Sequence, residues 1–345
     1  MMRKKLIKLT LFSSMLTLAM PSVQAETLQE ALAKAYQTNP TLTGARAGQR
    51  ANDENVPLAR SRGLPSADIS ASLTDNIEKA SNSFSSPSRI ASGRINLSMP
   101  LYAGGAIKNG IGAAESRVEA GQANLRGTEA DVFTGVVSAY MDVLRDEAIV
   151  GLNHSQVKVL QTNLEATKDR FDVGDLTRTD IAQSESRLAL AQSQLESAEA
   201  QLIGSRERYV QFVGNEPVGL QQPPILPNLP ATPEVAVESA LKNNPDLIAA
   251  NKAIEASRFD IKVARSSRMP KLSAFADENY SNYLNSIGGG FSNSSRSTAA
   301  GLQATFPLYQ GGAPSAQVRQ SQARSSQAIE QAIAAERGVI AQTRS

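Results

Sequence analysis

The sequence contains no cysteine, a single histidine and few aromatic residues, and these shortages exclude several kinds of function. Without cysteine there is no disulfide framework, so packing and hydrogen bonds have to hold the fold. No G-x-S-x-G or G-x-x-x-x-G-K-[ST] motif occurs, and Gly110-Ile111-Gly112 is followed by Glu115 where a dinucleotide fingerprint needs glycine. His154 lies in a charged helical pattern and is interpreted as a surface residue. We therefore expect no enzyme activity, no metal and no cofactor.

A hydrophobic run long enough to span a membrane as a helix is also missing. Basic residues near the start precede an apolar stretch from Leu9 to Met20, and small residues stand three and one before a break after Ala25. This pattern predicts a secretory signal peptide over residues 1–25. No later segment offers about 20 uncharged apolar residues, so the exported chain is expected to be soluble or to cross a membrane as strands.

The net charge of +2 depends on the predicted signal peptide. Four of the 35 basic residues lie within it and none of the 33 acidic residues do, which leaves the exported chain with 31 basic residues and a charge of −2. This balance removes the electrostatic support for a nucleic-acid-binding function. Alanine, serine and glutamine are abundant, which is typical of long helices that meet through small residues.

The chain contains a tandem duplication. The motif Asn39-Pro40-Thr41-Leu42 returns as Asn244-Pro245-Asp246-Leu247, 205 residues later. The segment Met-Pro-Leu-Tyr-Ala-Gly-Gly-Ala at 99–106 returns as Phe-Pro-Leu-Tyr-Gln-Gly-Gly-Ala at 306–313, 207 residues later. Matches that recur in the same order indicate two copies of one structural unit.

The duplication predicts a domain organisation. A first strand–helix repeat is expected at 26–216, a proline-rich linker at 217–233 and an incomplete second repeat at 234–345, because prolines at this density cannot continue a helix. Ser345 matches Ser138 in the middle of a helical pattern. A C-terminally truncated or fragmentary chain is therefore expected, and the alternative is a genuine variant that ends there.

Four segments alternate between apolar and polar residues as half-buried strands do. They lie at about 66–76, 90–101, 271–284 and 297–308. Phe275 interrupts the pattern of the third, and polar loops at 78–88 and 285–295 connect the members of each pair. Strands of about ten residues fit a transmembrane β-barrel, although a sandwich hairpin alternates in the same way. In lipid, four strands leave two open edges, so several chains would have to share one barrel.

A long helical hairpin is predicted after the first pair of strands. Helices at about 106–172 and 177–212 carry apolar residues at intervals of seven, the period of a left-handed supercoil. The first would be about 100 Å long. Gly174 can end it, and Thr177 or Thr179 can cap the next helix with Asp180 near its positive end. This tip is either an ordinary capped turn or a surface that meets a partner.

Three sets of residues resemble the TolC family of outer-membrane efflux and type I secretion channels. They are Thr27-Leu28-Gln29-Glu30-Ala31-Leu32 through Asn39-Pro40, both Pro-Leu-Tyr-x-Gly-Gly-Ala corners, and the tip from Arg170 to Asp180. The resemblance implies a mostly α fold with membrane β-structure. Each chain of a homotrimer would add four strands to a shared outer-membrane β-barrel and long helices to a periplasmic α-barrel.

The resemblance also implies the partners and the site. Such ducts are passive conduits in the outer membrane of Gram-negative bacteria, and they dock on a periplasmic adaptor and an inner-membrane transporter. The expected docking residues at the tip are Gly174, Asp175, Leu176, Thr177 and Asp180. The expected corners between barrel and helices are Pro100, Gly104, Gly105, Pro307, Gly311 and Gly312.

One departure from the family's pattern and two rival interpretations accompany this reading. The family's second tip, which helps to close the entrance, has no counterpart within the 345 residues. A periplasmic adaptor or an exported structural coiled coil would also contain a long helical hairpin, but neither explains the duplicated strand pairs. The sequence does not distinguish among drugs, proteins and metals as the exported cargo.

Overall fold

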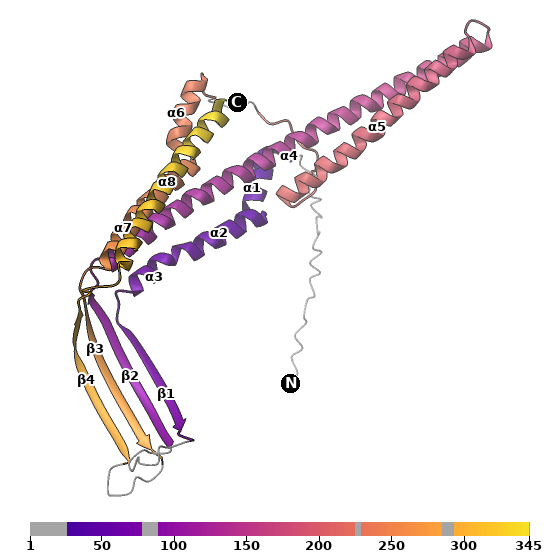
Figure 1. Cartoon of the computed structure of the whole chain (residues 1–345). Helices are drawn as coiled ribbons and strands as arrows, with labels where there is room; N and C mark the ends of the chain where they lie inside the picture. Colours follow the sequence, from indigo (N-terminus) through magenta and orange to yellow (C-terminus); the bar gives the residue numbers. More distant parts are fainter. Residues whose placement is uncertain (1–25, 78–88, 225–228, 285–292, 345) are drawn as a thin grey trace, which may run out of the picture. The chain divides into compact units, whose positions relative to one another are not determined.

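The computed structural model describes residues 26–77, 89–224, 229–284 and 293–344 (Figure 1). It is mostly helical with one four-stranded antiparallel sheet, which confirms the predicted fold class. The predicted signal peptide and most of both predicted strand loops lie outside the described residues. In the described part of the chain, no helix combines the length and apolar character needed to cross a membrane.

Contacts divide the chain into two units, each of which is described by itself. The first comprises Met1–Ala35 and Gly135–Pro224, and the second comprises Tyr36–Thr134 and Ile225–Ser345. Helix α4 (Ala106–Asp172) contributes to both. Its 67 residues correspond to about 100 Å at 1.5 Å per residue.

The first unit is built on an antiparallel helical hairpin. Helix α5 (Arg178–Val213) returns along α4 and ends at Gly214, whose φ of 90° is the left-handed conformation that favours glycine at a helix end. Helix α1 (Leu28–Thr38) begins in this unit. The largest fully buried side chains are Tyr140, Val136 and Val143 of α4 with Tyr209 and Val213 of α5. They form the core that holds the hairpin together.

The helices of the second unit show the duplication in their caps. Helices α2 (Pro40–Asp53) and α7 (Pro245–Ser266) follow α1 and α6 (Pro233–Asn243) respectively. Asn39 and Asn244 precede them with nearly identical backbone angles, φ −62° and ψ 123° against φ −64° and ψ 124°. In both cases the asparagine side chain accepts hydrogen bonds from the two amides that follow proline. The repeated sequence motif is thus a repeated capping device.

One stretch of helix is divided, and one element boundary differs from the sequence prediction. Residues 40–61 form two helices, α2 and α3 (Asn55–Ser61), which meet at Glu54. Strand β4 (Ser294–Thr305) begins and ends three residues before the predicted 297–308. Pro307 has no amide hydrogen to donate to a ladder, which explains why the strand ends at Thr305. The apolar alternation of the sequence nevertheless continues through Phe306 and Leu308.

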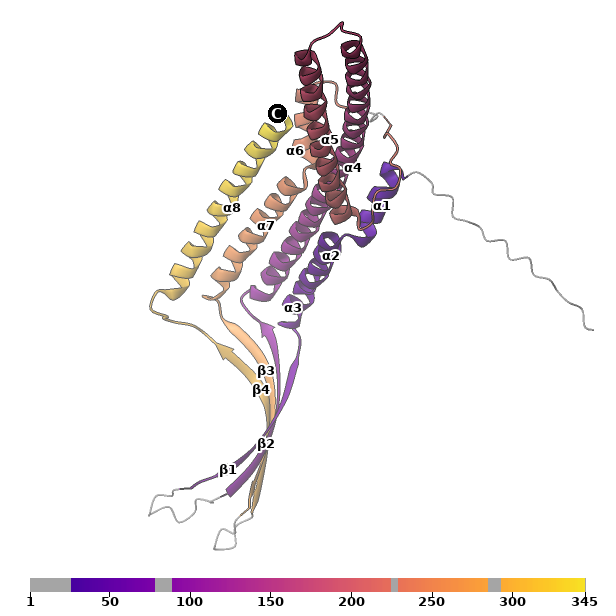
Figure 2. The ribbon, with the colours of Figure 1, turned by 90° about the vertical axis from the view of Figure 1, so that its right-hand side faces the viewer.

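The four strands form one sheet. Strands β1 (Ser66–Asp75), β2 (Arg89–Tyr102), β3 (Lys271–Tyr283) and β4 lie in chain order, so the two hairpins join through β2 and β3. Figure 2 shows the sheet as one twisted layer, with α8 (Ala313–Arg344) and α7 beside each other at its helical end. Strands β1 and β4 are its two edges.

The register separates an apolar from a polar face. Ile69 pairs with Ile95, and one residue away Asp68 pairs with Asn96 on the opposite face. Phe275 lies on the polar face opposite Gly301, where a Cβ would come within 3.1 Å of its ring. An aromatic ring beside a strand glycine covers backbone that would otherwise be exposed, which accounts for the break in alternation at this position.

Candidate functional site

The tip of the α4–α5 hairpin is a turn that its own hydrogen bonds define. Gly174 has a φ of 83°, and its amide donates to the Phe171 carbonyl at 2.9 Å. The Asp175 amide donates to the Arg170 carbonyl, also at 2.9 Å. These bonds satisfy carbonyls left open at the end of α4 and place a left-handed residue where glycine is favoured.

Two polar pairs hold the residues that follow. The Arg170 guanidinium donates to one oxygen of Asp175 from Nε at 2.9 Å and from Nη2 at 2.7 Å. The carboxylate of Asp180 accepts from the Thr177 amide at 2.8 Å and from its hydroxyl at 2.7 Å. This capping box begins α5, and the hydrogen bonds from Thr177 hold the pKa of Asp180 below its ordinary value.

The structure therefore brings the five predicted tip residues together but gives them different tasks. Asp175, Thr177 and Asp180 are engaged in the turn itself, whereas Leu176 is half-buried. Val173 is 81% exposed at the same turn and is absent from the predicted set. The sequence signal for an exposed Val173 is its position directly before Gly174, the glycine predicted to end the helix.

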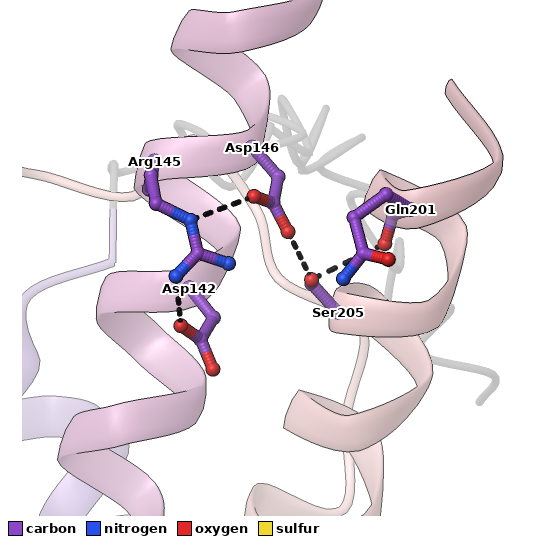
Figure 3. Close-up of polar contacts among 5 residues, drawn as sticks. All are labelled: Asp142, Arg145, Asp146, Gln201 and Ser205. Carbon is purple, nitrogen blue, oxygen red and sulfur yellow. Dashed lines mark hydrogen bonds and ion pairs between the residues drawn. The ribbon is translucent and has the colours of Figure 1, made fainter. Parts of the chain in front are cut away.

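A buried polar link fixes α4 against α5 below the tip (Figure 3). Asp146 is only 2% exposed and accepts from the Arg145 Nε at 2.9 Å and from the Ser205 hydroxyl of α5. Arg145 also pairs with Asp142 at 2.7 Å. The hydrogen bond from Arg145 holds the pKa of Asp146 below its ordinary value in spite of its burial. The sequence does not predict the bond between Asp146 and Ser205, because the two residues are far apart along the chain.

The two glycine corners adopt the same backbone conformation in both repeats. Gly104 and Gly105 have φ of 62° and 84°, and Gly311 and Gly312 have φ of 58° and 80°. A Cβ on Gly104 would lie 2.5 Å from the Met269 Cβ, whereas a Cβ on Gly311 would meet nothing within 4 Å. Both corners need glycine for its conformation, and only the first also needs it for space.

The two corner prolines lie at the ends of the ladders. Pro100 of β2 comes after Ser98, the last partner of β1 in that direction, and next to an irregularity in the pairing with β3. Pro307 follows the end of β4. Proline is tolerated in both places because no strand hydrogen bond from its nitrogen is required there.

The sheet offers two chemically different surfaces. On the polar face, the Asn96 side chain donates to Asp68 at 3.0 Å and the Arg94 Nε donates to Asn279 at 2.5 Å. On the apolar face, Ile69 is 78% exposed and Leu302 is 68% exposed. The described residues include no group of three or more potential metal ligands. A sheet that is wet on one face and apolar on the other suits the wall of a pore in lipid better than a reaction centre.

Comparison with known proteins decides the family. The sequence profile described as "Outer membrane efflux protein" matches residues 31–215 and 236–345, which includes both repeats. The chain belongs to the outer membrane efflux protein family. Membership excludes the adaptor and the structural coiled coil as alternatives. It also confirms the predicted resemblance.

Individual relatives agree with this assignment. The chain is similar to outer membrane efflux protein BepC of Brucella suis biovar 1, with 32% identity over 325 residues that cover 94% of this chain and 70% of the relative. It is 27% identical to outer membrane protein TolC of Vibrio cholerae over 348 residues, 99% of this chain and 78% of the relative. The crystal structure of VceC from Vibrio cholerae has the same fold, with a TM-score of 0.72 at 20% identity over 91% of this chain and 75% of that one.

These findings establish the general function. The protein is an outer-membrane duct of the kind that serves efflux or secretion, and it is a passive channel rather than an enzyme. The predicted localisation in the outer membrane of a Gram-negative bacterium is confirmed by the same relatives. Family membership does not decide the roles of the tip and corner residues.

Proposed function

We propose that three copies of this protein form one duct, with four strands from each chain in a shared outer-membrane β-barrel. The tip of α4 and α5 then docks on a periplasmic adaptor that links the duct to an inner-membrane transporter. The observation that carries the first part is the open sheet. Among the residues that the structure describes, strands β1 and β4 each have one unpaired edge, and unpaired backbone groups are not tolerated in lipid.

The number of copies rests on size and on the family resemblance. Outer-membrane barrels have at least eight strands, so one chain with four strands is too small. Two or three chains would give a barrel large enough to lie within the range that outer-membrane barrels adopt. The resemblance to the TolC family favours three, and the α4–α5 hairpin supplies the long helices that such a duct needs.

The test of the trimer is its state in the membrane. Outer-membrane fractions should contain β-rich particles with three times the mass of the exported chain, resistant to detergent at room temperature and dissociated by boiling. Light scattering of the purified particle measures that mass directly. A monomer recovered from the soluble periplasm would contradict the proposal.

The docking proposal rests on what the tip leaves available. Among its charged residues, Arg170 and Asp175 are paired with each other, and Asp180 is engaged in capping. Val173 is the exposed apolar group of the turn, and no internal hydrogen bond depends on its side chain. An adaptor would bury Val173 and the edge of Leu176, and the rigid turn would reduce the entropy lost on docking.

A serine at position 173 tests this surface without disturbing the turn. Val173→Ser should lower the recovery of the adaptor in cross-linked pull-downs. It should also make cells more sensitive to exported drugs, or lower the amount of secreted toxin, while trimers stay intact. Val235→Ser is the matched control, because Val235 of α6 is 52% exposed and distant in sequence from the tip. Substitution of Asp180 is less informative, since it removes the cap of α5 as well. Equal adaptor recovery from both serine variants would exclude Val173 from the docking surface.

A further inference from the structure

The two repeats differ at one equivalent place between their helices. Helices α1, α2 and α4 of the first repeat correspond to α6, α7 and α8 of the second. The offset is 205 residues for the first two helices and 207 residues for the third. Both places lie within the second unit, which comprises Tyr36–Thr134 and Ile225–Ser345. Equivalent side chains can therefore be compared directly.

In the first repeat, one arginine bridges the three helices. The Arg46 guanidinium lies 3.9 Å from the centroid of the Tyr36 ring, and its Nη1 donates to the Tyr36 carbonyl at 2.8 Å. Its Nη2 lies 3.7 Å from a carboxylate oxygen of Glu129. The Tyr36 ring in turn lies beside Phe133, with the ring centroids 6.0 Å apart. The chain thus holds its own cation between an aromatic face and a carboxylate.

The second repeat keeps the carboxylate but lacks the arginine. Glu336 of α8 corresponds to Glu129 of α4. Asn251 of α7 takes the place of Arg46, and Leu241 of α6 takes the place of the tyrosine. Within the described part of the chain, no basic side chain forms an ion pair with Glu336. This carboxylate therefore has no internal cation.

A groove of about 380 Å³ lies between α6, α7 and α8 at this place. Its volume falls within the range of about 300–1,000 Å³ that is typical of small-molecule sites. The polar groups that line it are the Asn251 amide and the Glu336 carboxylate. The other lining side chains are aliphatic, namely Leu241, Leu247, Ile254, Ile329, Ala332 and Ile333. The groove thus combines an apolar wall with one uncompensated negative charge.

We propose that this groove binds a small organic cation with an apolar body. The first repeat indicates the chemistry of the occupant, because a guanidinium on an aliphatic stem takes the equivalent place there. The aliphatic wall removes the body of such a ligand from water, and Glu336 supplies the opposite charge. An anion of the same size would be repelled by the same carboxylate. The inference needs neither the trimer nor the docking tip.

Protection of a thiol tests the groove locally, because the chain contains no native cysteine. Ala332→Cys places one thiol in the lining, and the uncharged reagent iodoacetamide measures how fast this thiol reacts in the purified full chain. Benzylguanidinium is the probe, because a guanidinium stays charged at working pH. The anion 3-phenylpropionate is the control of similar size. Benzylguanidinium should slow the reaction to a saturable limit, whereas 3-phenylpropionate should not.

Three variants in the Ala332→Cys background separate charge from space. Glu336→Gln should raise the probe concentration for half protection by about fivefold, the upper end for a partly exposed ion pair. Glu330→Gln is the matched control, because Glu330 is an exposed residue of α8 outside the groove lining, and it should change nothing. Asn251→Arg restores the arrangement of the first repeat. It should abolish the protection, because the chain would then fill its own groove.

Four results would overturn the proposal. Equal protection in the Glu336→Gln and Glu330→Gln variants would remove the carboxylate from the site. Equal protection by 3-phenylpropionate and benzylguanidinium would show that charge is not selected. Protection that survives Asn251→Arg would place the probe outside the groove. A thiol at position 332 that reacts only after the purified duct is dissociated would show that another copy of the chain covers the groove.

Discussion

Two buried tyrosines of the first unit allow a matched test of what its hydrogen bonds contribute. Tyr140 and Tyr209 are both fully buried, and their ring centroids lie 6.3 Å apart. The Tyr140 hydroxyl lies 2.9 Å from the Glu26 carbonyl and 2.5 Å from the Gln221 carbonyl, and shares its proton between them. The Tyr209 hydroxyl makes no hydrogen bond of acceptable geometry among the described residues, although the Glu26 carboxylate lies near enough to contribute to its raised pKa. The same change, tyrosine to phenylalanine, therefore removes very different contacts.

The expected magnitudes follow from these contacts. Tyr140→Phe leaves the buried Glu26 carbonyl and the part-buried Gln221 carbonyl without their shared donor and should cost about 1–3 kcal/mol. Tyr209→Phe removes a hydroxyl that was buried without compensation and should be about neutral or slightly stabilising. Burial raises the pKa of both tyrosines, so both are protonated at neutral pH and no charge change complicates the comparison.

Hydrogen exchange at the Gln221 amide provides the measurement. This amide donates to the Glu26 carbonyl at 3.1 Å, so it reports directly on the segment that Tyr140 holds. Tyr140→Phe should speed its exchange by about 5- to 140-fold, since 1.4 kcal/mol corresponds to a factor of ten. Tyr209→Phe should leave it unchanged. Equal acceleration in both variants would refute the reasoning, because packing rather than the hydroxyl would then hold the segment.

Two further predictions concern a corner and the buried carboxylate. Gly104→Ala should destabilise the second unit by about 1–3 kcal/mol more than Gly311→Ala in denaturant titrations, because both share left-handed strain but only Gly104 would clash with Met269. Equal losses would show that strain alone matters. The lowered pKa of Asp146 means that its contribution to stability is present above the unfolded value of about 3.9 and is lost as pH falls through the folded pKa. Asp146→Asn should therefore flatten the acid side of the stability profile of the first unit, and an unchanged profile would contradict this.

Much of the fold could be predicted because its signals are local. Alternation along ten residues identifies a strand, and a seven-residue period identifies a long helix, without knowledge of any distant partner. The predicted hairpin helices at 106–172 and 177–212 lie close to Ala106–Asp172 and Arg178–Val213 for this reason. Gly174 and the paired glycines of the corners could be identified for the same reason, since their positive φ angles are a property of single residues.

Other features depend on residues that meet only in the folded chain. The division of labour at the tip is one case, because the Arg170–Asp175 pair and the exposure of Val173 follow from the shape of the turn. The break between α2 and α3 at Glu54 is of a different kind, because Pro57 stands three residues later and has no amide hydrogen for the Asp53 carbonyl, which is a local signal. The buried bond between Ser205 and Asp146 joins residues 59 positions apart.

The amino-acid sequence by itself determined that the protein is a duplicated unit of strands and long helices, because repetition and periodicity are written along the chain. Only the tertiary structure decided that the two hairpins join through β2 and β3 into one sheet with β1 and β4 at its edges. The physical reason is that a strand's own pattern fixes which face is apolar, whereas its neighbour is chosen by backbone hydrogen bonds between strands such as β2 and β3. Register partners on these two strands, such as Arg94 and Asn279, lie 185 residues apart in the sequence.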